Sequence, residues 1–183
     1  MSKILNKKIW VIKVGEPAVY NKKYNNIKPL RSAMLVDQLS KNKCISVTWW
    51  TSNFQHHSKD FVNQNTRSYS EYIKNIKSIY LDSSGYKNNI SLKRIIDHKS
   101  IANDFKKRSV LEPKPDLIIC SWPTIELAYE AYRYAKKNNI IFVIDIRDMW
   151  PDVIYDALNN SLYAKFVINT FLKYDQKLIE CFS

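Results

Sequence analysis

Glycine is almost absent from this chain of 183 residues, in which only Gly15 and Gly85 occur. Glycine reaches positive φ angles without strain and lets a ligand approach the backbone closely. A dinucleotide-binding fingerprint needs three glycines, and the segment after the first apolar run reads GEPAVY, with Gly15 alone. The sequence therefore argues against an NAD-type site, and Gly15 is expected at a strand-to-loop corner, either as a plain turn or with its amide groups facing a ligand.

Paired cysteines and long apolar runs are also missing. Cys44, Cys120 and Cys181 form no CxxC motif, and the first two lie in apolar runs, which predicts buried thiols in a reducing cytoplasm. The apolar stretch Ile9 to Val14 is interrupted by Lys13 and is too short for a signal peptide. No run approaches the roughly 20 apolar residues of a membrane span.

The motifs of several enzyme classes are absent too. The sequence has no P-loop, no HExxH motif and no residues in the order of a Ser-His-Asp triad, which excludes the common NTPase, metalloprotease and hydrolase sites. Its adjacent histidines lack the spacing of zinc ligands, so neither a metal nor a cofactor is predicted.

Acidic residues are few, and the formal net charge is +12. The excess of Lys and Arg lies wholly before residue 116. This asymmetry is typical of a surface that meets an anionic partner, such as nucleic acid, anionic lipid or phosphate. A Lys-, Asn- and Ile-rich composition is equally what an A/T-rich coding sequence produces without selection for binding.

Apolar runs rich in β-branched residues alternate with segments of helical periodicity, and this alternation favours a parallel sheet. The predicted strands span Lys8 to Val14, Cys44 to Trp50, Ser68 to Tyr72, Lys77 to Leu81, Asp116 to Cys120 and Ile140 to Ile146. The predicted helices span Pro29 to Asn42, Ser91 to Arg108, Thr124 to Lys137 and Leu162 to Ile179.

This order predicts one α/β domain over residues 1–183, a Rossmann-like three-layer α/β/α arrangement with a mainly parallel sheet. Ligands of such domains bind at the carboxyl ends of the strands. Unusual polar segments follow four predicted strands, and each is a candidate site. They are Gly15 to Pro17, Thr51 to Lys59, Ser121 to Pro123 and Asp145 to Asp152.

Two of these segments carry distinctive chemistry. His56, His57 and Lys59 lie on a long polar loop, where they are predicted to contact phosphate or sugar hydroxyls, although ordinary surface residues explain them as well. Arg147 and Asp148 come directly after an apolar strand, a place where packing alone does not account for charged side chains. They are either functional or an ion pair that fixes the crossover.

The segment DIRDMWPD resembles the RDLWP stretch of retaining family-four glycosyltransferases of the GT-B fold, enzymes that build bacterial O-antigen and capsule units. Three further segments resemble that family in the expected order, and together they cover nearly all of residues 8–152. They are VTWWTSNFQHHSKDF, GYKNNISLKRIIDH and DLIICSWPTIELAYEAYRYAKK. The isolated Gly15 departs from the glycine-rich loop that is common in the family.

The resemblance implies that residues 1–183 are the N-terminal, acceptor-binding half of a GT-B enzyme. In the family, a second domain binds the nucleotide sugar and carries an E-x7-E motif, and no such motif occurs here. This chain is therefore expected to be inactive alone, while the full-length enzyme would transfer an N-acetylhexosamine or hexose from a UDP-sugar to an undecaprenyl-pyrophosphate-linked sugar.

The resemblance also implies roles for particular residues. Asp148 and Arg147 are the expected catalytic residues, because a carboxylate beside the acceptor hydroxyl can orient it or accept its proton. The expected acceptor-binding residues are Gly15, Glu16, His56, His57, Lys59, Arg94 and Ser121.

The partners implied are the lipid-linked acceptor and an anionic membrane surface, with the protein peripheral at the cytoplasmic face of the cell membrane. Two alternatives remain open. The charge would suit a basic α/β module that binds nucleic acid, although no RNP-like strand or helix-turn-helix supports this and no nucleic acid is expected. The chain could also be a non-catalytic subunit that a partner chain completes.

Overall fold

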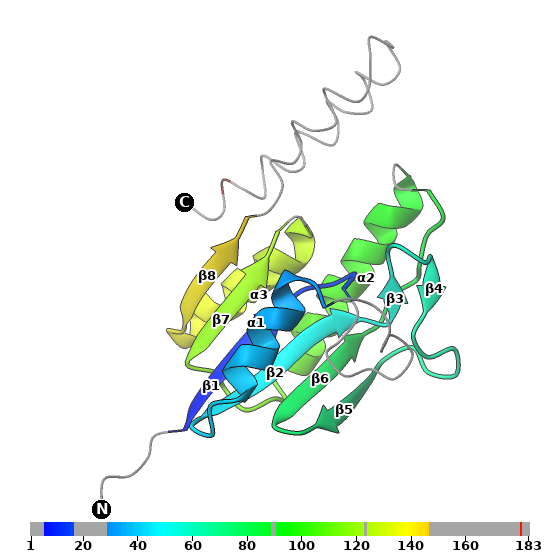
Figure 1. Ribbon diagram of the computed structural model, residues 1–183. Coiled ribbons are helices and arrows are strands. Elements are labelled where there is room, and N and C mark those ends of the chain that lie inside the picture. Colours follow the sequence, from blue (N-terminus) through cyan, green and yellow to red (C-terminus); the bar gives the residue numbers. More distant parts are fainter. Residues whose placement is uncertain (1–5, 17–28, 89–90, 123, 147–179, 181–183) are drawn as a thin grey trace, which may run out of the picture.

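The structure is a computed structural model, and it describes residues 6–16, 29–88, 91–122, 124–146 and 180. Its strands are β1 (Lys7–Ile12), β2 (Ile45–Ser52), β3 (Phe54–Gln55), β4 (Asp60–Phe61), β5 (Tyr69–Ile73), β6 (Ile76–Leu81), β7 (Leu117–Ser121) and β8 (Ile141–Asp145). Its helices are α1 (Arg31–Ser40), α2 (Leu92–Ser109) and α3 (Ile125–Asn138), as Figure 1 shows.

Six of the strands form one sheet in the order β5-β6-β2-β1-β7-β8. Strand β1 lies inside the sheet and pairs in parallel with β2 on one side and with β7 on the other. The pairs β2 with β6 and β7 with β8 are parallel too, whereas β5 joins β6 as an antiparallel edge strand. The predicted strands of this sheet are confirmed at nearly the expected positions.

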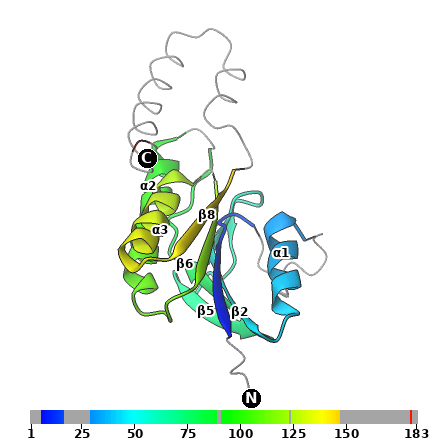
Figure 2. The ribbon, with the colours of Figure 1, turned by 90° about the vertical axis from the view of Figure 1, so that its left-hand side faces the viewer.

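Helices cover both faces of the sheet. Helix α1 lies on one face, and α2 and α3 lie side by side on the other (Figure 2). The α1 face buries a mostly aliphatic cluster that includes Val11, Val36 and Val47, together with Trp49. The α2 and α3 face buries a larger cluster that includes aromatic rings. The predicted mixed α/β domain with a mainly parallel sheet is confirmed.

The larger cluster is built around two tryptophans. Trp10 and Trp50, both almost fully buried, meet edge to face with ring centroids 4.9 Å apart. Phe105 of α2 packs edge-on against both rings, and Tyr134 of α3 stacks on Trp10 at 5.1 Å. Such ring pairs contribute beyond the burial of their area, so they hold α2 and α3 against β1 and β2.

Local signals set the ends of the two long helices. Ser91 caps α2, because its side-chain oxygen accepts a hydrogen bond from the Arg94 backbone N–H at 3.3 Å. Asn139 ends α3 in the left-handed conformation, with φ of 53°. Both helices therefore begin and end close to the boundaries that the sequence predicts.

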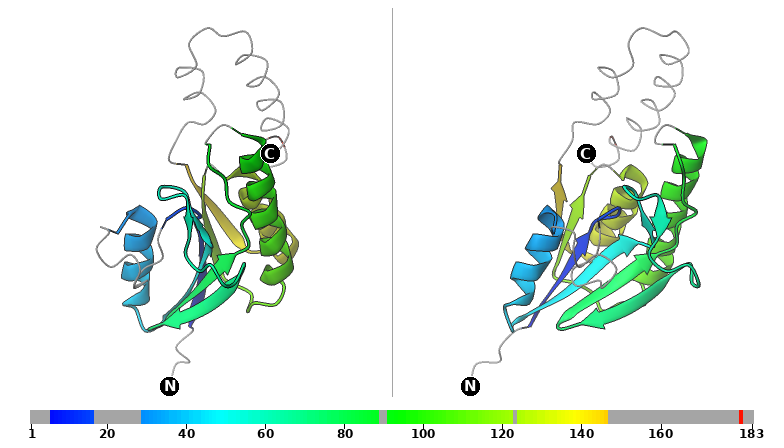
Figure 3. Two further views of the ribbon diagram at one scale, coloured as in Figure 1. Left: turned by 90° about the vertical axis from the view of Figure 1, so that its right-hand side faces the viewer. Right: turned by 45° about the vertical axis from the view of Figure 1, so that its right-hand side comes forward.

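The polar loop predicted over Thr51 to Thr66 is more ordered than expected, because it contains the antiparallel pair of β3 and β4. This short pair lies beside α2 in the views of Figure 3. The predicted helix Leu162 to Ile179 lies outside the described residues. Within the described ranges, no helix is both long and apolar enough to cross a bilayer.

Candidate functional site

The candidate site lies at the edge of the sheet where β1, β2 and β6 have their carboxyl ends. Gly15 follows β1, and the turn between β3 and β4 carries His56, His57 and Lys59. Tyr86 follows β6, and Arg94 lies in the first turn of α2. Segments far apart in the sequence therefore meet at the edge where parallel α/β domains bind their ligands.

Tyr86 is the centre of this group, and its side chain is buried. Lys59 Nζ lies 4.4 Å from the centroid of the Tyr86 ring, and the Arg94 guanidinium carbon lies 5.9 Å from it. Both distances suit cation–π contact, which favours a positive charge over an aromatic face. Burial raises the pKa of Tyr86, so its hydroxyl stays protonated.

His56 joins this group through one ring nitrogen. Its Nδ1 lies 2.5 Å from the Tyr86 hydroxyl oxygen and 3.4 Å from Lys59 Nζ. Burial, followed by the charges of Lys59 and Arg94, lowers the pKa of His56 from 6.5 to about 4. His56 is therefore neutral at physiological pH, while Lys59 and Arg94 supply the positive charge of the site.

A second chain of contacts connects the site to α3. Arg94 Nε donates to His98 Nε2 at 3.5 Å, and His98 Nδ1 lies 3.4 Å from a carboxylate oxygen of Glu126. The His98 ring also lies edge-on to Tyr86, with centroids 6.5 Å apart. Glu126, at the first turn of α3, thereby holds His98 in place, and His98 in turn holds Arg94 near Tyr86.

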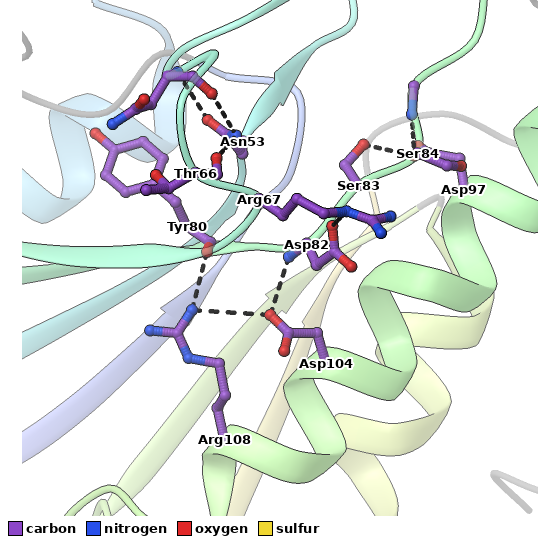
Figure 4. A network of polar contacts seen from close by, with 12 residues as sticks. Asn53, Thr66, Arg67, Tyr80, Asp82, Ser83, Ser84, Asp97, Asp104 and Arg108 are labelled. Carbon is purple, nitrogen blue, oxygen red and sulfur yellow. Dashed lines mark hydrogen bonds and ion pairs between the residues drawn. The ribbon is translucent and has the colours of Figure 1, made fainter.

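The loop before Tyr86 is fixed by a buried carboxylate, shown in Figure 4. Asp97 Oδ1 accepts hydrogen bonds from the Ser83 hydroxyl at 2.5 Å, from the Gly85 backbone N–H at 2.9 Å and from the Ser84 hydroxyl at 3.4 Å. Three donors from consecutive residues on one oxygen leave this loop little freedom. Asp97 therefore determines where Tyr86 lies.

The same helix face holds the end of β6. Asp104 accepts a hydrogen bond from the Asp82 backbone N–H at 2.9 Å, and Arg108 donates to the Tyr80 carbonyl at 2.9 Å. Arg67 reaches Asp82 from the other side at 3.0 Å (Figure 4). Helix α2 thus fixes both the strand end and the loop that leads into the site.

Gly85 is where the two site-bearing loops touch. Its φ is +69°, and a Cβ atom there would lie 2.9 Å from Phe61 Cζ and 3.2 Å from two ring atoms of Phe54. The ring of Phe54 also packs on Tyr86, with centroids 5.2 Å apart. A side chain at position 85 would thus separate the loop of Tyr86 from the loop of His56.

The structure brings together four of the seven predicted acceptor-binding residues. Gly15 lies against His56, since a Cβ on Gly15 would be 3.3 Å from His56 Cβ. Lys59 and Arg94 complete the set through Tyr86. His57 adjoins them, with its ring 5.5 Å from that of His56, and it is exposed.

The remaining two predicted acceptor-binding residues, Glu16 and Ser121, make other contacts. Glu16 is buried, and its backbone carbonyl accepts a hydrogen bond from Thr51. Ser121 belongs to a second polar group at the ends of β7 and β8. There its hydroxyl donates to Asp145 at 3.3 Å, and Asp145 pairs with Arg31 at 2.7 Å.

The predicted catalytic residues Arg147 and Asp148 lie outside the described residues. Within the described ranges, no group of three or more His, Cys, Asp or Glu side chains could hold a metal ion.

Sequence reasoning missed Tyr86, Asp97, His98 and Glu126. Tyr86 carried a usable signal, because it directly follows one of the two glycines at a strand end. Asp97 and His98 both lie about one turn beyond Arg94 on α2, but their partners come from other segments of the chain. No local pattern could have identified those contacts.

Comparison of the chain with protein-family models and with curated proteins finds no match.

Proposed function

We propose that this chain is the acceptor-binding domain of a retaining glycosyltransferase of the GT-B fold, and that its acceptor is a sugar linked to a lipid pyrophosphate. One observation carries the proposal. Lys59 and Arg94, which come from separate segments, converge on Tyr86 beside His56 at the carboxyl edge of a mainly parallel sheet.

The chemistry of this cluster suits a phosphate or pyrophosphate group. Arg and Lys bind phosphate oxygens through charge-assisted hydrogen bonds, which are stronger than neutral ones. Burial and the charge of Arg94 lower the pKa of Lys59, which indicates that the two cations repel each other. An anionic ligand would relieve that repulsion.

The remaining parts of the proposal rest on the sequence resemblance. A second domain of the GT-B fold would hold the UDP-sugar, and Asp148, beside Arg147, would orient the acceptor hydroxyl or accept its proton. Glycosyl transfer would then need both domains. The mixed α/β fold and the ligand-binding edge of the sheet are compatible with this role.

The same proposal places the protein at the cytoplasmic face of a membrane, where an undecaprenyl carrier resides. Each Lys or Arg near an anionic surface contributes about 1 kcal/mol of attraction, and the net charge of the chain is +12. We expect the chain to sediment with anionic liposomes and to be released by salt. Equal sedimentation with neutral liposomes would contradict this part of the proposal.

Calorimetric titration with a short-chain polyprenyl-pyrophosphate sugar tests the acceptor site. We expect the Lys59→Met and Arg94→Met variants to bind it about 10-fold to 100-fold more weakly than the unchanged chain, because each loses a charge-assisted hydrogen bond. The binding of a UDP-sugar should stay undetectable in all three proteins.

Helix α3 supplies matched controls for both variants. Lys136 lies 5.3 Å from the Tyr132 ring, and Arg133 lies 5.7 Å from the Tyr129 ring, so each repeats a cation over a tyrosine away from the site. Lys136→Met and Arg133→Met should leave the affinity unchanged. If the control variants weaken binding as much as the site variants, the affinity depends only on the net charge of the protein, and the proposed site is wrong.

A further inference from the structure

Two side-chain groups that can donate hydrogen bonds, one from Lys59 and one from Tyr86, converge on a single nitrogen of His56. Lys59 Nζ is 3.4 Å from His56 Nδ1, and the Tyr86 hydroxyl oxygen is 2.5 Å from the same atom. A lysine ammonium can only donate, so Nδ1 must act as an acceptor in its contact with Lys59. The Tyr86 hydroxyl must then donate to Nδ1 as well.

This assignment fixes the position of the imidazole proton. A neutral histidine has one donor and one acceptor nitrogen, and Nδ1 is the acceptor here. The proton therefore lies on Nε2. Among the described residues, Nε2 has no hydrogen-bond partner, so this N–H is available to a ligand.

The charged groups around His56 favour the same state. Lys59 and Arg94 oppose a further positive charge, and His57 and His98 do so when they are protonated. The carboxylate of Glu126 contacts His98 rather than His56. A proton on Nδ1 would also face the Lys59 ammonium, which cannot accept a hydrogen bond.

We propose that Tyr86 and Lys59 lock His56 as a neutral ring, and that its Nε2–H donates a hydrogen bond to a phosphate oxygen of the ligand. Tyr86 is then a positioning residue, and His56 contributes a directed hydrogen bond rather than a positive charge. The inference rests on the anion-binding role proposed for this site. It implies that Lys59 and Arg94 supply the fixed charge, which suits a ligand group with two negative charges.

The tautomer can be measured without any ligand. Long-range proton–nitrogen correlation spectra of the whole chain should show His56 as the Nε2–H form, unchanged between pH 7.5 and pH 5. In Tyr86→Phe, which keeps the ring under both cations but removes the hydroxyl donor, we expect a mixture of tautomers. A predominant Nδ1–H form, or titration of His56 near pH 6.5, would overturn the inference even if the ligand binds.

Two replacements of His56 test the donated hydrogen bond with inorganic pyrophosphate as the probe. The amide nitrogen of glutamine reaches the place of Nε2, whereas the shorter asparagine reaches only that of Nδ1. We therefore expect His56→Gln to stay within about 3-fold of the original affinity and His56→Asn to lose about 10-fold or more.

The outcomes separate this inference from the proposed function. Equal losses in the Gln and Asn variants would show that His56 does not donate through Nε2, although the site would still bind an anion. Absence of pyrophosphate binding in the unchanged chain would overturn the anion site itself, and with it the role of Nε2–H in binding. The tautomer spectra would then still report whether Tyr86 and Lys59 fix the ring.

Discussion

Replacing Gly85 by valine is expected to lower the free energy of unfolding by about 3 to 4 kcal/mol. The backbone at this position has φ of +69°, which a β-branched residue adopts only with strain. The new Cβ would also meet Phe61 Cζ at 2.9 Å and the ring of Phe54 at 3.2 Å. Because Phe54 is buried, its ring has little room to move away.

Urea unfolding of the two proteins measures this loss, and Asn139→Ala provides the control. Asn139 has φ of 53° but ends a helix, so its replacement tests a left-handed backbone alone and should cost only about 1 kcal/mol. The pyrophosphate affinity of folded Gly85→Val should fall as well, since Tyr86 would shift. Equal destabilisation by the two variants would show that the contact with the two rings is unimportant.

Replacing Asp97 by alanine is expected to cost about 3 kcal/mol of unfolding free energy. Its Oδ1 accepts from the Ser83 hydroxyl and from the Gly85 backbone N–H, and the carboxylate is almost fully buried. Removal of this oxygen leaves donors without their partner in a poorly hydrated place. The loop before Tyr86 would lose its anchor on α2.

Thermal and urea unfolding measure the loss, with Asp37→Ala as the matched control. Asp37 lies on α1 and pairs with Lys41 at 2.9 Å on the surface, so its replacement should change stability by about 0.5 kcal/mol or less. Asp97→Asn keeps the size of the side chain and shows whether the charge is needed. If Asp97→Ala proves as mild as Asp37→Ala, the loop is held by other contacts and Asp97 does not position Tyr86.

The sheet could be predicted from the sequence because its strands are short apolar runs that glycine, proline or polar residues bound on either side. The run from Lys8 is followed by Gly15, and that from Asp116 follows a Pro-Lys-Pro segment, so strand limits were readable. The pair of β3 and β4 was not predicted. Each has two residues, and their pairing depends on Phe54 meeting Phe61 rather than on a local pattern.

The candidate site could be predicted only where chemistry follows a strand directly. His56 and Lys59 were identifiable because polar residues after an apolar strand meet at one edge of a parallel sheet. Asp97 and Glu126 were not, since their roles depend on α2 and α3 lying side by side on one face. Ser121 follows a strand as well, but β1 separates β7 from β2, the strand that precedes the histidine loop.

The interior position of β1 also sets the order in which the sheet can form. Ile9 pairs with Val47 on one side and with Leu117 on the other, so its second neighbour is synthesised much later than its first. We expect β1, β2 and β6 to associate early and β7 to dock late, because long-range contacts form slowly. Until then, the open edge of β1 can pair with another chain, so nascent or refolding molecules are prone to aggregate through this strand.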